Sequence, residues 1–238
     1  MDSNIQAPRD KIDLFTDKII DGIKFRQKYF PLNSIIYQKD AIPIKGRTGI
    51  SLFEYSIEGL EEYHAKLGRF LFPDQRTMTN ISIESRVERI VPASKVHKRE
   101  INALKEIILV YPEFAKKLYL PGDNPEIYGE TAYRDADIAS FLLSSRMCLG
   151  TEVAESKSTE DPSILELEKD SDIIEKLRRP EREKLVLGKA RAIARGSGLD
   201  LDVIEELFKW MISTTIKVEV EYLRQKQEKA RVSQPLKL

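Results

Sequence analysis

The spacing of apolar residues constrains the fold of this chain more than any other feature. They recur every three or four positions along most of the sequence. This 3.6-residue period is typical of amphipathic helices, and the strict alternation that marks β-strands is hard to find. The pattern predicts helices over residues 9–30, 50–70, 95–118, 130–157, 164–177, 181–196 and 200–230. We therefore expect an all-α, multi-helix bundle that forms a single domain over residues 1–238.

Short segments rich in proline and glycine separate these helices, among them 121–129. Connections of this length favour antiparallel packing of neighbouring helices. Pro180 fits the first turn of the helix that carries Glu183, and either Asp200 or Asp202 is suited to cap the last helix.

The balance of charge argues against several classes of function. The 238 residues include 39 Lys and Arg and 39 Asp and Glu, so the formal net charge is zero. Proteins that bind nucleic acid or anionic membranes carry a clustered excess of basic residues, and we expect neither partner here. The longest apolar runs, such as 107–110, are far too short to span a bilayer. Since His64 and His97 are the only histidines and Cys148 is the only cysteine, we expect neither a zinc site nor an intrachain disulfide.

The start of the chain bears on its compartment. Residues 1–4 are polar and show no signal-peptide core, so we expect a reduced, cytoplasmic compartment. Asn80, Ile81 and Ser82 form a glycosylation sequon, and a secreted protein supplied without its leader is the alternative.

Motifs of the common enzyme classes are missing from the sequence. Gly196 and Gly198 are not completed into a dinucleotide fingerprint, and there is no Gly-Lys-Ser/Thr phosphate loop, Gly-x-Ser-x-Gly elbow or His-Glu-x-x-His pair. If the protein is an enzyme, we expect its chemistry to need neither a metal nor a covalent nucleophile.

Charged residues on apolar helix faces are the informative anomaly. In the first predicted helix, one apolar face carries an arginine near each end, Arg9 and Arg26. In the 130–157 helix, Arg146 and Lys157 lie eleven residues apart, which is close to three turns. Both cations therefore point the same way, about 16 Å apart.

The last two predicted helices add two acids to this pattern. Glu183 shares a face with Leu187, and Glu219 follows Thr215 by one turn on an otherwise apolar face. Unpaired buried charge is costly, and the four cations against two carboxylates leave an excess of two positive charges. If these six side chains face one cavity, that cavity suits a dianionic small molecule.

Each of these residues also has a structural interpretation. Arg9 can reach water from the end of its face, and Lys157 lies beside a loop. Glu183 is an ordinary acid of a first helical turn, and Glu219 can lie on a solvated face. Thr215 can bond a carbonyl of its own helix. From the residues alone these alternatives stay open.

Several segments resemble a known family. Residues 146–157, with the ending Gly-x-x-Val-Ala-Glu-x-Lys, resemble the Arg-x10-Lys helix of the all-helical chorismate mutases. Residues 215–223 resemble the last helix of the larger fungal and plant form, and residues 9–10 and 17–20 together with Arg26 resemble its first helix. The segment 64–74 is similar to its second helix, so the resemblance spans nearly the whole chain in order.

The resemblance implies an isomerase of the shikimate pathway that converts chorismate to prephenate without a cofactor, in aromatic amino acid biosynthesis. It implies that Arg9 and Arg146 bind the two substrate carboxylates and that Thr215 supports one of them. It further implies that Lys157 bonds the ether oxygen and a carboxylate, and that Glu183 accepts a hydrogen bond from the substrate hydroxyl.

Three further positions take their interpretation from the resemblance. Glu219 falls where the fungal form has a glutamic acid facing the ether oxygen. Because a carboxylate there would repel the developing negative charge, we expect Glu219 to act as a neutral acid, which burial favours. Arg182 resembles an arginine of the short bacterial form and is a lesser candidate for substrate binding, and Arg179 stands in place of a family asparagine.

Regulation is the point at which the chain departs from the family. The fungal and plant enzymes respond to aromatic amino acids at a dimer interface, so the resemblance also implies a homodimer. At the corresponding positions a pair of arginines is reduced to Gly68 and Arg69, and a Gly-Ser turn reads Gly129 and Glu130. Since Glu130 would place a carboxylate near that of a bound amino acid, we expect weak or absent regulation by tyrosine and tryptophan.

Two other classes of function stay open. One is a helical binding or interaction protein of the same fold that lacks turnover. The other is a helical scaffold without a ligand, in which the charges on the apolar faces would be exposed to solvent.

Overall fold

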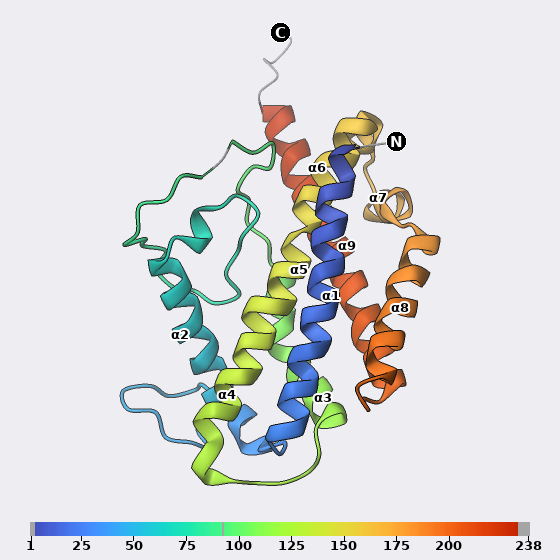
Figure 1. Ribbon diagram of the computed structural model, residues 1–238. Helices are drawn as coiled ribbons and strands as arrows, with labels where there is room; N and C mark the ends of the chain where they lie inside the picture. Colours follow the sequence, from blue (N-terminus) through green and yellow to red (C-terminus); the bar gives the residue numbers. More distant parts are fainter. Residues whose placement is uncertain (1–2, 92, 233–238) are drawn as a thin grey trace.

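The computed structural model describes residues 3–91 and 93–232, and Figure 1 shows how helices dominate this part of the chain. The α-helices are α1 (Ser3–Tyr29), α2 (Leu52–Lys66), α3 (Glu106–Leu118), α4 (Tyr128–Asp137), α5 (Ser144–Cys148), α6 (Gly150–Glu160), α7 (Asp170–Leu177), α8 (Pro180–Arg195) and α9 (Leu201–Val232). Short 3₁₀ turns are η1 (Ser34–Tyr37), η2 (Arg69–Leu71), η3 (Ala103–Lys105), η4 (Pro125–Ile127) and η6 (Pro162–Glu166). The described residues form no β-strand, and the predicted all-α bundle is confirmed.

Four of the helices enclose the cavity that is described in the next subsection. α1 packs against both α6 and α8, and α9 packs against the same two helices. In Figure 1, α1 and α6 lie in front of α9, with α8 to the right and α2 to the left. α2 packs on α4 and so covers the side of the bundle away from α8. No helix of the described residues has an apolar stretch long enough to cross a membrane.

The central rod differs from the single helix predicted over 130–157. It runs from α4 to α6 but contains a π-helical segment, η5 (Ile138–Leu143), and a turn at Leu149. Each π turn holds more residues than an α turn, so the segment rotates the faces of α4 and α6 relative to each other. Gly129, expected to end the preceding linker, is the second residue of α4.

The predicted helix over 95–118 is wrong in its first part. Residues 93–102 are irregular, and helical structure begins only at η3 and α3. Side chains of α9 replace the helical hydrogen bonds there, because Glu221 accepts from the backbone N–H of Asn102 at 2.6 Å and Gln225 accepts from that of Glu100 at 3.2 Å. Backbone donors that a distant helix satisfies have no need of a local helix.

Two predicted helix starts are confirmed. Pro180 is the first residue of α8, where its missing N–H costs no helical bond. Of the two candidate caps of α9, Asp200 performs the role, since its carboxylate accepts from the N–H groups of Asp202 at 2.9 Å and Val203 at 3.1 Å.

Arg26 joins the end of α1 to α4 inside the core. Its guanidinium is fully buried and forms a two-pronged ion pair with Asp135, at 2.9 and 3.2 Å. It also donates to the carbonyls of Phe30 at 2.8 Å and Pro31 at 2.9 Å, just beyond the end of α1. Arg26 is therefore a structural residue that caps a helix end, and it does not line the cavity described next.

Candidate active site

A cavity of about 110 Å³ lies within the four-helix arrangement of α1, α6, α8 and α9. Every residue predicted to bind or transform a substrate lines it: Arg9 from α1, Arg146 from α5, Lys157 from α6, Arg182 and Glu183 from α8, and Thr215 and Glu219 from α9. Five of the six charges noted on the helix faces therefore converge on one cavity, whereas Arg26 does not reach it.

Apolar side chains complete the walls of this cavity. Ile12, Val153, Val186, Ile212 and Ile216 all contribute, and the sequence-based interpretation had not assigned them to the site. Each lies three or four residues from a charged or polar lining residue of its own helix. That helical spacing is the sequence signal that could have assigned these apolar residues to the cavity. Low-polarity walls strengthen any electrostatic contact formed inside.

Arg146 is the most deeply buried cation of the site. It is 2% exposed, forms no ion pair with any described residue, and its Nε is buried without a hydrogen-bond partner. Burial lowers the pKa of its guanidinium to about 10, with Asp13 opposing and Arg182 adding to that effect. The side chain stays charged at neutral pH. A buried charge without a counterion is suited to hold an anionic group.

Lys157 and Glu219 form an ion pair across the cavity. The Lys157 Nζ lies 3.0 Å from a Glu219 carboxylate oxygen and also donates to the carbonyl of Leu177 at 2.6 Å. The two side chains are 11% and 6% exposed, so the solvated interpretation of both is wrong. Burial raises the pKa of Glu219 above its ordinary value, although the charge and hydrogen bond of Lys157 oppose the rise.

Gly150 allows α6 to approach α9 where these side chains meet. A Cβ at this position would lie 3.0 Å from the backbone oxygen of Thr215 and 3.4 Å from the Cγ of Glu219. The absence of a side chain thus sets the spacing between the helix of Lys157 and the helix of Glu219.

The remaining polar lining residues differ in how far they are engaged. Arg182 forms an ion pair with Asp13 at 2.7 Å, a partner that the sequence had not indicated. One carboxylate oxygen of Glu183 is buried without a partner, and the Arg9 side chain forms no hydrogen bond or ion pair with the described residues. The Thr215 hydroxyl donates to the carbonyl of Met211 at 2.8 Å, as its structural interpretation predicted.

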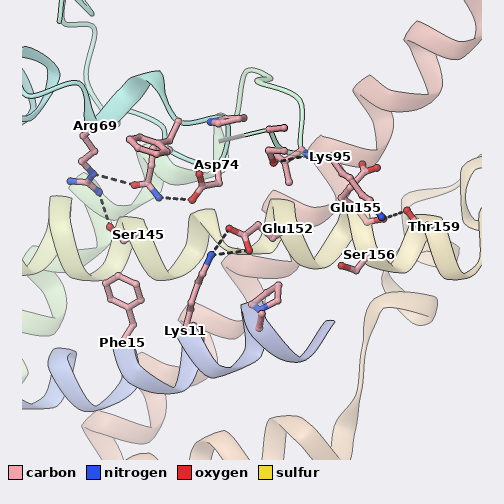
Figure 2. Close-up of a pocket in the computed structure, with 18 of the residues that line it drawn as sticks. Lys11, Phe15, Arg69, Asp74, Lys95, Ser145, Glu152, Glu155, Ser156 and Thr159 are labelled. Carbon is pink, nitrogen blue, oxygen red and sulfur yellow. Dashed lines mark hydrogen bonds and ion pairs between the residues drawn. The ribbon is translucent and has the colours of Figure 1, made fainter. Parts of the chain in front are cut away.

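A second, larger cavity of about 680 Å³ lies on the other side of α1 and α6 (Figure 2). Arg69 lines it, and the Lys11–Glu152 ion pair of 3.0 Å crosses it. The Arg69 guanidinium is engaged within the chain: it donates to Ser145 at 2.7 Å and to Gln75 at 3.1 Å, and also contacts His64 and the carbonyl of Ser140.

The other two residues predicted at a regulatory site lie elsewhere. Gly129 and Glu130 are exposed at the start of α4. Arg69 contacts the central rod at the carbonyl of Ser140. Glu130 lies ten residues before Ser140 on this rod, which corresponds to about 15 Å along the helix axis. One chain therefore does not bring Arg69 together with Gly129 and Glu130.

Comparison with known proteins bears directly on this cavity. A family model described as chorismate mutase type II matches residues 127–220. Chorismate mutase 2 of Petunia hybrida is 27% identical over 242 residues, which cover 90% of each chain. AtCM1, solved with tyrosine bound in its allosteric site, superposes with a TM-score of 0.80 at 26% identity, covering 94% of this chain and 96% of the other. By sequence and by fold, these matches place the chain close to the all-helical chorismate mutases.

Other chorismate mutases agree with this placement over different lengths. The Aro7p chorismate mutase of Candida albicans, solved in complex with L-Trp, has a TM-score of 0.81 at 25% identity, covering 93% of this chain and 90% of that one. The chloroplastic chorismate mutase 1 of Arabidopsis thaliana is 34% identical over 63% of this chain, a match that spans only 44% of the relative. The family match over 127–220 contains six of the seven predicted cavity residues, with Arg9 outside it.

Proposed function

We propose that the protein is a chorismate mutase, which rearranges chorismate to prephenate. The reaction breaks an ether C–O bond while a C–C bond forms within one molecule, so it calls for a held conformation and charge stabilisation rather than a nucleophile. The observation that carries the proposal is the convergence of seven suitable side chains from separate helices on one cavity.

Two arginines are proposed to bind the two substrate carboxylates. Arg146 supports this role because it is buried without a counterion, so an incoming carboxylate would supply the missing partner. Arg9 lines the same cavity from the facing helix and has no partner among the described residues. Guanidinium groups bind carboxylates through paired, charge-assisted hydrogen bonds.

Lys157 and Glu219 are proposed to stabilise the ether oxygen as it gains negative charge. Both already lie within 3.0 Å of each other at a buried position, so one oxygen atom could accept from both. Glu219 can donate only when protonated, and its raised pKa supports that state. A substrate carboxylate that engages Lys157 would weaken the ion pair and favour protonation of Glu219 further.

The other lining residues are proposed as orienting contacts. The unpartnered carboxylate oxygen of Glu183 is suited to accept a hydrogen bond from the substrate hydroxyl. Thr215 would support a carboxylate after its hydroxyl turns from Met211, and Arg182 would add charge nearby while its Asp13 pair holds it in place.

An assay of chorismate disappearance with the purified chain tests the proposal. Arg146→Gln should lower kcat/KM by roughly 30-fold or more, because loss of a buried charge-assisted pair costs at least about 2 kcal/mol. Arg195→Gln, at an exposed position outside the cavity, should leave the rate unchanged. A folded Arg146→Gln variant with full turnover would contradict the proposed site, and a wild-type chain without turnover would favour a non-catalytic binding protein.

We also propose a homodimer with weak or absent regulation by tyrosine and tryptophan. The guanidinium of Arg69 has most of its donors engaged within the chain, which leaves little capacity for an amino-acid carboxylate. We further propose that the protein is cytoplasmic. Relatives differ in compartment, since two from Arabidopsis are described as chloroplastic.

A further inference from the structure

Two arginines line the active-site cavity without any role in the proposed chemistry. Arg178 directly follows α7 and Arg179 directly precedes α8, so both belong to the short connection between these helices. Both line the cavity that holds Arg146 and Glu219, and both are exposed to solvent. They therefore lie where the cavity meets the solvent.

Local structure accounts for only part of this pair. One terminal nitrogen of Arg179 donates to the carbonyls of Lys176 at 2.8 Å and Arg178 at 2.9 Å, which holds the side chain against the end of α7. Its other nitrogens, and the whole guanidinium of Arg178, have no hydrogen bond to the described residues. Neither arginine forms an ion pair with a described carboxylate. Helix capping accounts for one nitrogen of Arg179, and both positive charges lack an ion-pair partner among the described residues.

The interior of the cavity already matches a dianion without these two residues. Arg9, Arg146 and Lys157 supply three positive charges, and Glu183 removes one of them. Glu219 is neutral in the proposed catalytic state, and Asp13 compensates Arg182. Two positive charges remain to face the two substrate carboxylates. Arg178 and Arg179 are thus an additional cationic pair at the entrance.

We infer that Arg178 and Arg179 form a cationic entrance that draws a dianionic substrate into the cavity. The inference rests on the proposed function. Charges of one sign around the mouth of a low-polarity cleft raise the local concentration of an oppositely charged ligand. Salt weakens such attraction because it acts through solvent, whereas contacts inside the cavity are screened far less.

This role predicts a particular kinetic pattern. Exposed charges act mainly on encounter and initial binding, so their loss should raise KM and leave kcat nearly unchanged. Buried residues such as Arg146 should affect kcat as well. The contribution of the entrance should shrink as ionic strength rises, while that of Arg146 should persist.

Two double variants separate charge from hydrogen bonding. Arg178→Gln with Arg179→Gln removes both charges, and Arg178→Lys with Arg179→Lys retains them while changing the donor geometry. We expect the glutamine pair to raise KM by about three- to tenfold at low salt, with little change in kcat and a weaker salt dependence of kcat/KM. The lysine pair should keep the wild-type salt dependence, and Arg195→Gln serves as the control for loss of an exposed arginine elsewhere.

Several outcomes would overturn the inference. An unchanged KM and salt dependence in the glutamine pair would do so, and so would a lysine pair that behaves like the glutamine pair. Calorimetric binding of prephenate gives the same comparison without turnover, and the glutamine pair should bind it more weakly by a similar factor. A wild-type chain that neither converts chorismate nor binds prephenate refutes the proposed function itself, whereas a wild-type chain that does both, with unaffected variants, refutes only the cationic entrance.

Discussion

In the buried pair of Lys157 and Glu219, two opposing effects act on the protonation of Glu219. Their 3.0 Å contact stabilises the carboxylate, whereas burial of both side chains favours the neutral acid. The net direction is a raised pKa of Glu219, and Arg179 is a second positive charge that opposes the rise. The proposed chemistry needs the neutral acid, so pH should decide how much of the enzyme is active.

We predict that kcat falls as pH rises through the titration of Glu219, because the carboxylate repels the charge that develops on the ether oxygen. Glu219→Gln keeps a hydrogen-bond donor at every pH and should flatten this decline, which a series of rate measurements from acidic to alkaline pH would reveal. An identical profile in both proteins would exclude the acid role.

The stability of the fold gives an independent check on the same residue. Because the pKa of Glu219 is raised in the folded state, the native protein holds a proton that the unfolded chain has released, and stability falls as pH rises above the ordinary carboxyl value. Glu219→Gln should therefore gain in free energy of unfolding relative to wild type as pH increases, measured by urea denaturation.

At the scale of elements, the contact between α6 and α9 sets the geometry of the site. Gly150→Ala would place a Cβ 3.0 Å from the backbone oxygen of Thr215. The backbone of α9 cannot easily move aside to relieve this contact. We expect a loss of about 1–3 kcal/mol in the free energy of unfolding, with a lower kcat because Thr215 and Glu219 are displaced.

Gly188→Ala is the matched control for this substitution. Gly188 lies inside α8, and a Cβ there meets nothing within 4 Å. The change should stabilise the protein by about 0.5–1 kcal/mol through helix propensity. Chemical denaturation of both variants measures their free energies of unfolding. Equal changes in the two variants would contradict close packing at Gly150.

The junction of α1 with α4 depends on another buried pair. Arg26→Met leaves the fully buried carboxyl of Asp135 without its counterion, and among the described residues only the hydroxyls of Tyr37 and Tyr111 still donate to it. We expect a loss of about 3–5 kcal/mol in the free energy of unfolding. Lys184→Ala, which breaks an exposed pair with Glu181, should change it by less than about 1 kcal/mol. Similar losses in both variants would show that burial of the Arg26 pair is unimportant.

At the scale of the whole molecule, the residues proposed for a regulatory site lie apart within one chain. Arg69 is bonded to the central rod at Ser140 and Ser145, and Glu130 lies about 15 Å away along the rod. A site that uses both needs a second copy of the chain. Light scattering after size-exclusion chromatography should report a dimer, and a monomer at all concentrations would refute this.

We predict that saturating tyrosine or tryptophan changes the rate less than about twofold, since the Arg69 donors are engaged and Glu130 would repel a ligand carboxylate. Initial rates with each amino acid test this. The variant Glu130→Ser removes the repulsive charge at an exposed position. Strong inhibition or activation of the wild-type chain would overturn the prediction.

The candidate site could be predicted largely because helix faces are a local property. The spacing of Arg146 and Lys157, and of Thr215 and Glu219, follows from 3.6 residues per turn whatever the rest of the chain does. The family resemblance assigned roles to the same residues. Arg178 was missed because it lies in a connection between helices, where no periodicity indicates which way a side chain points.

The helical class, most helix positions and the charged faces follow from neighbours a few residues apart, so the amino-acid pattern alone could predict them. Which faces meet depends on how the helices pack in three dimensions. Arg26 pairs with Asp135 over 109 positions of sequence, and in the irregular segment 93–102 side chains of α9 accept from the backbone N–H groups of Glu100 and Asn102. Contacts between distant segments depend on how whole helices pack, and packing is a property that no short stretch of sequence contains.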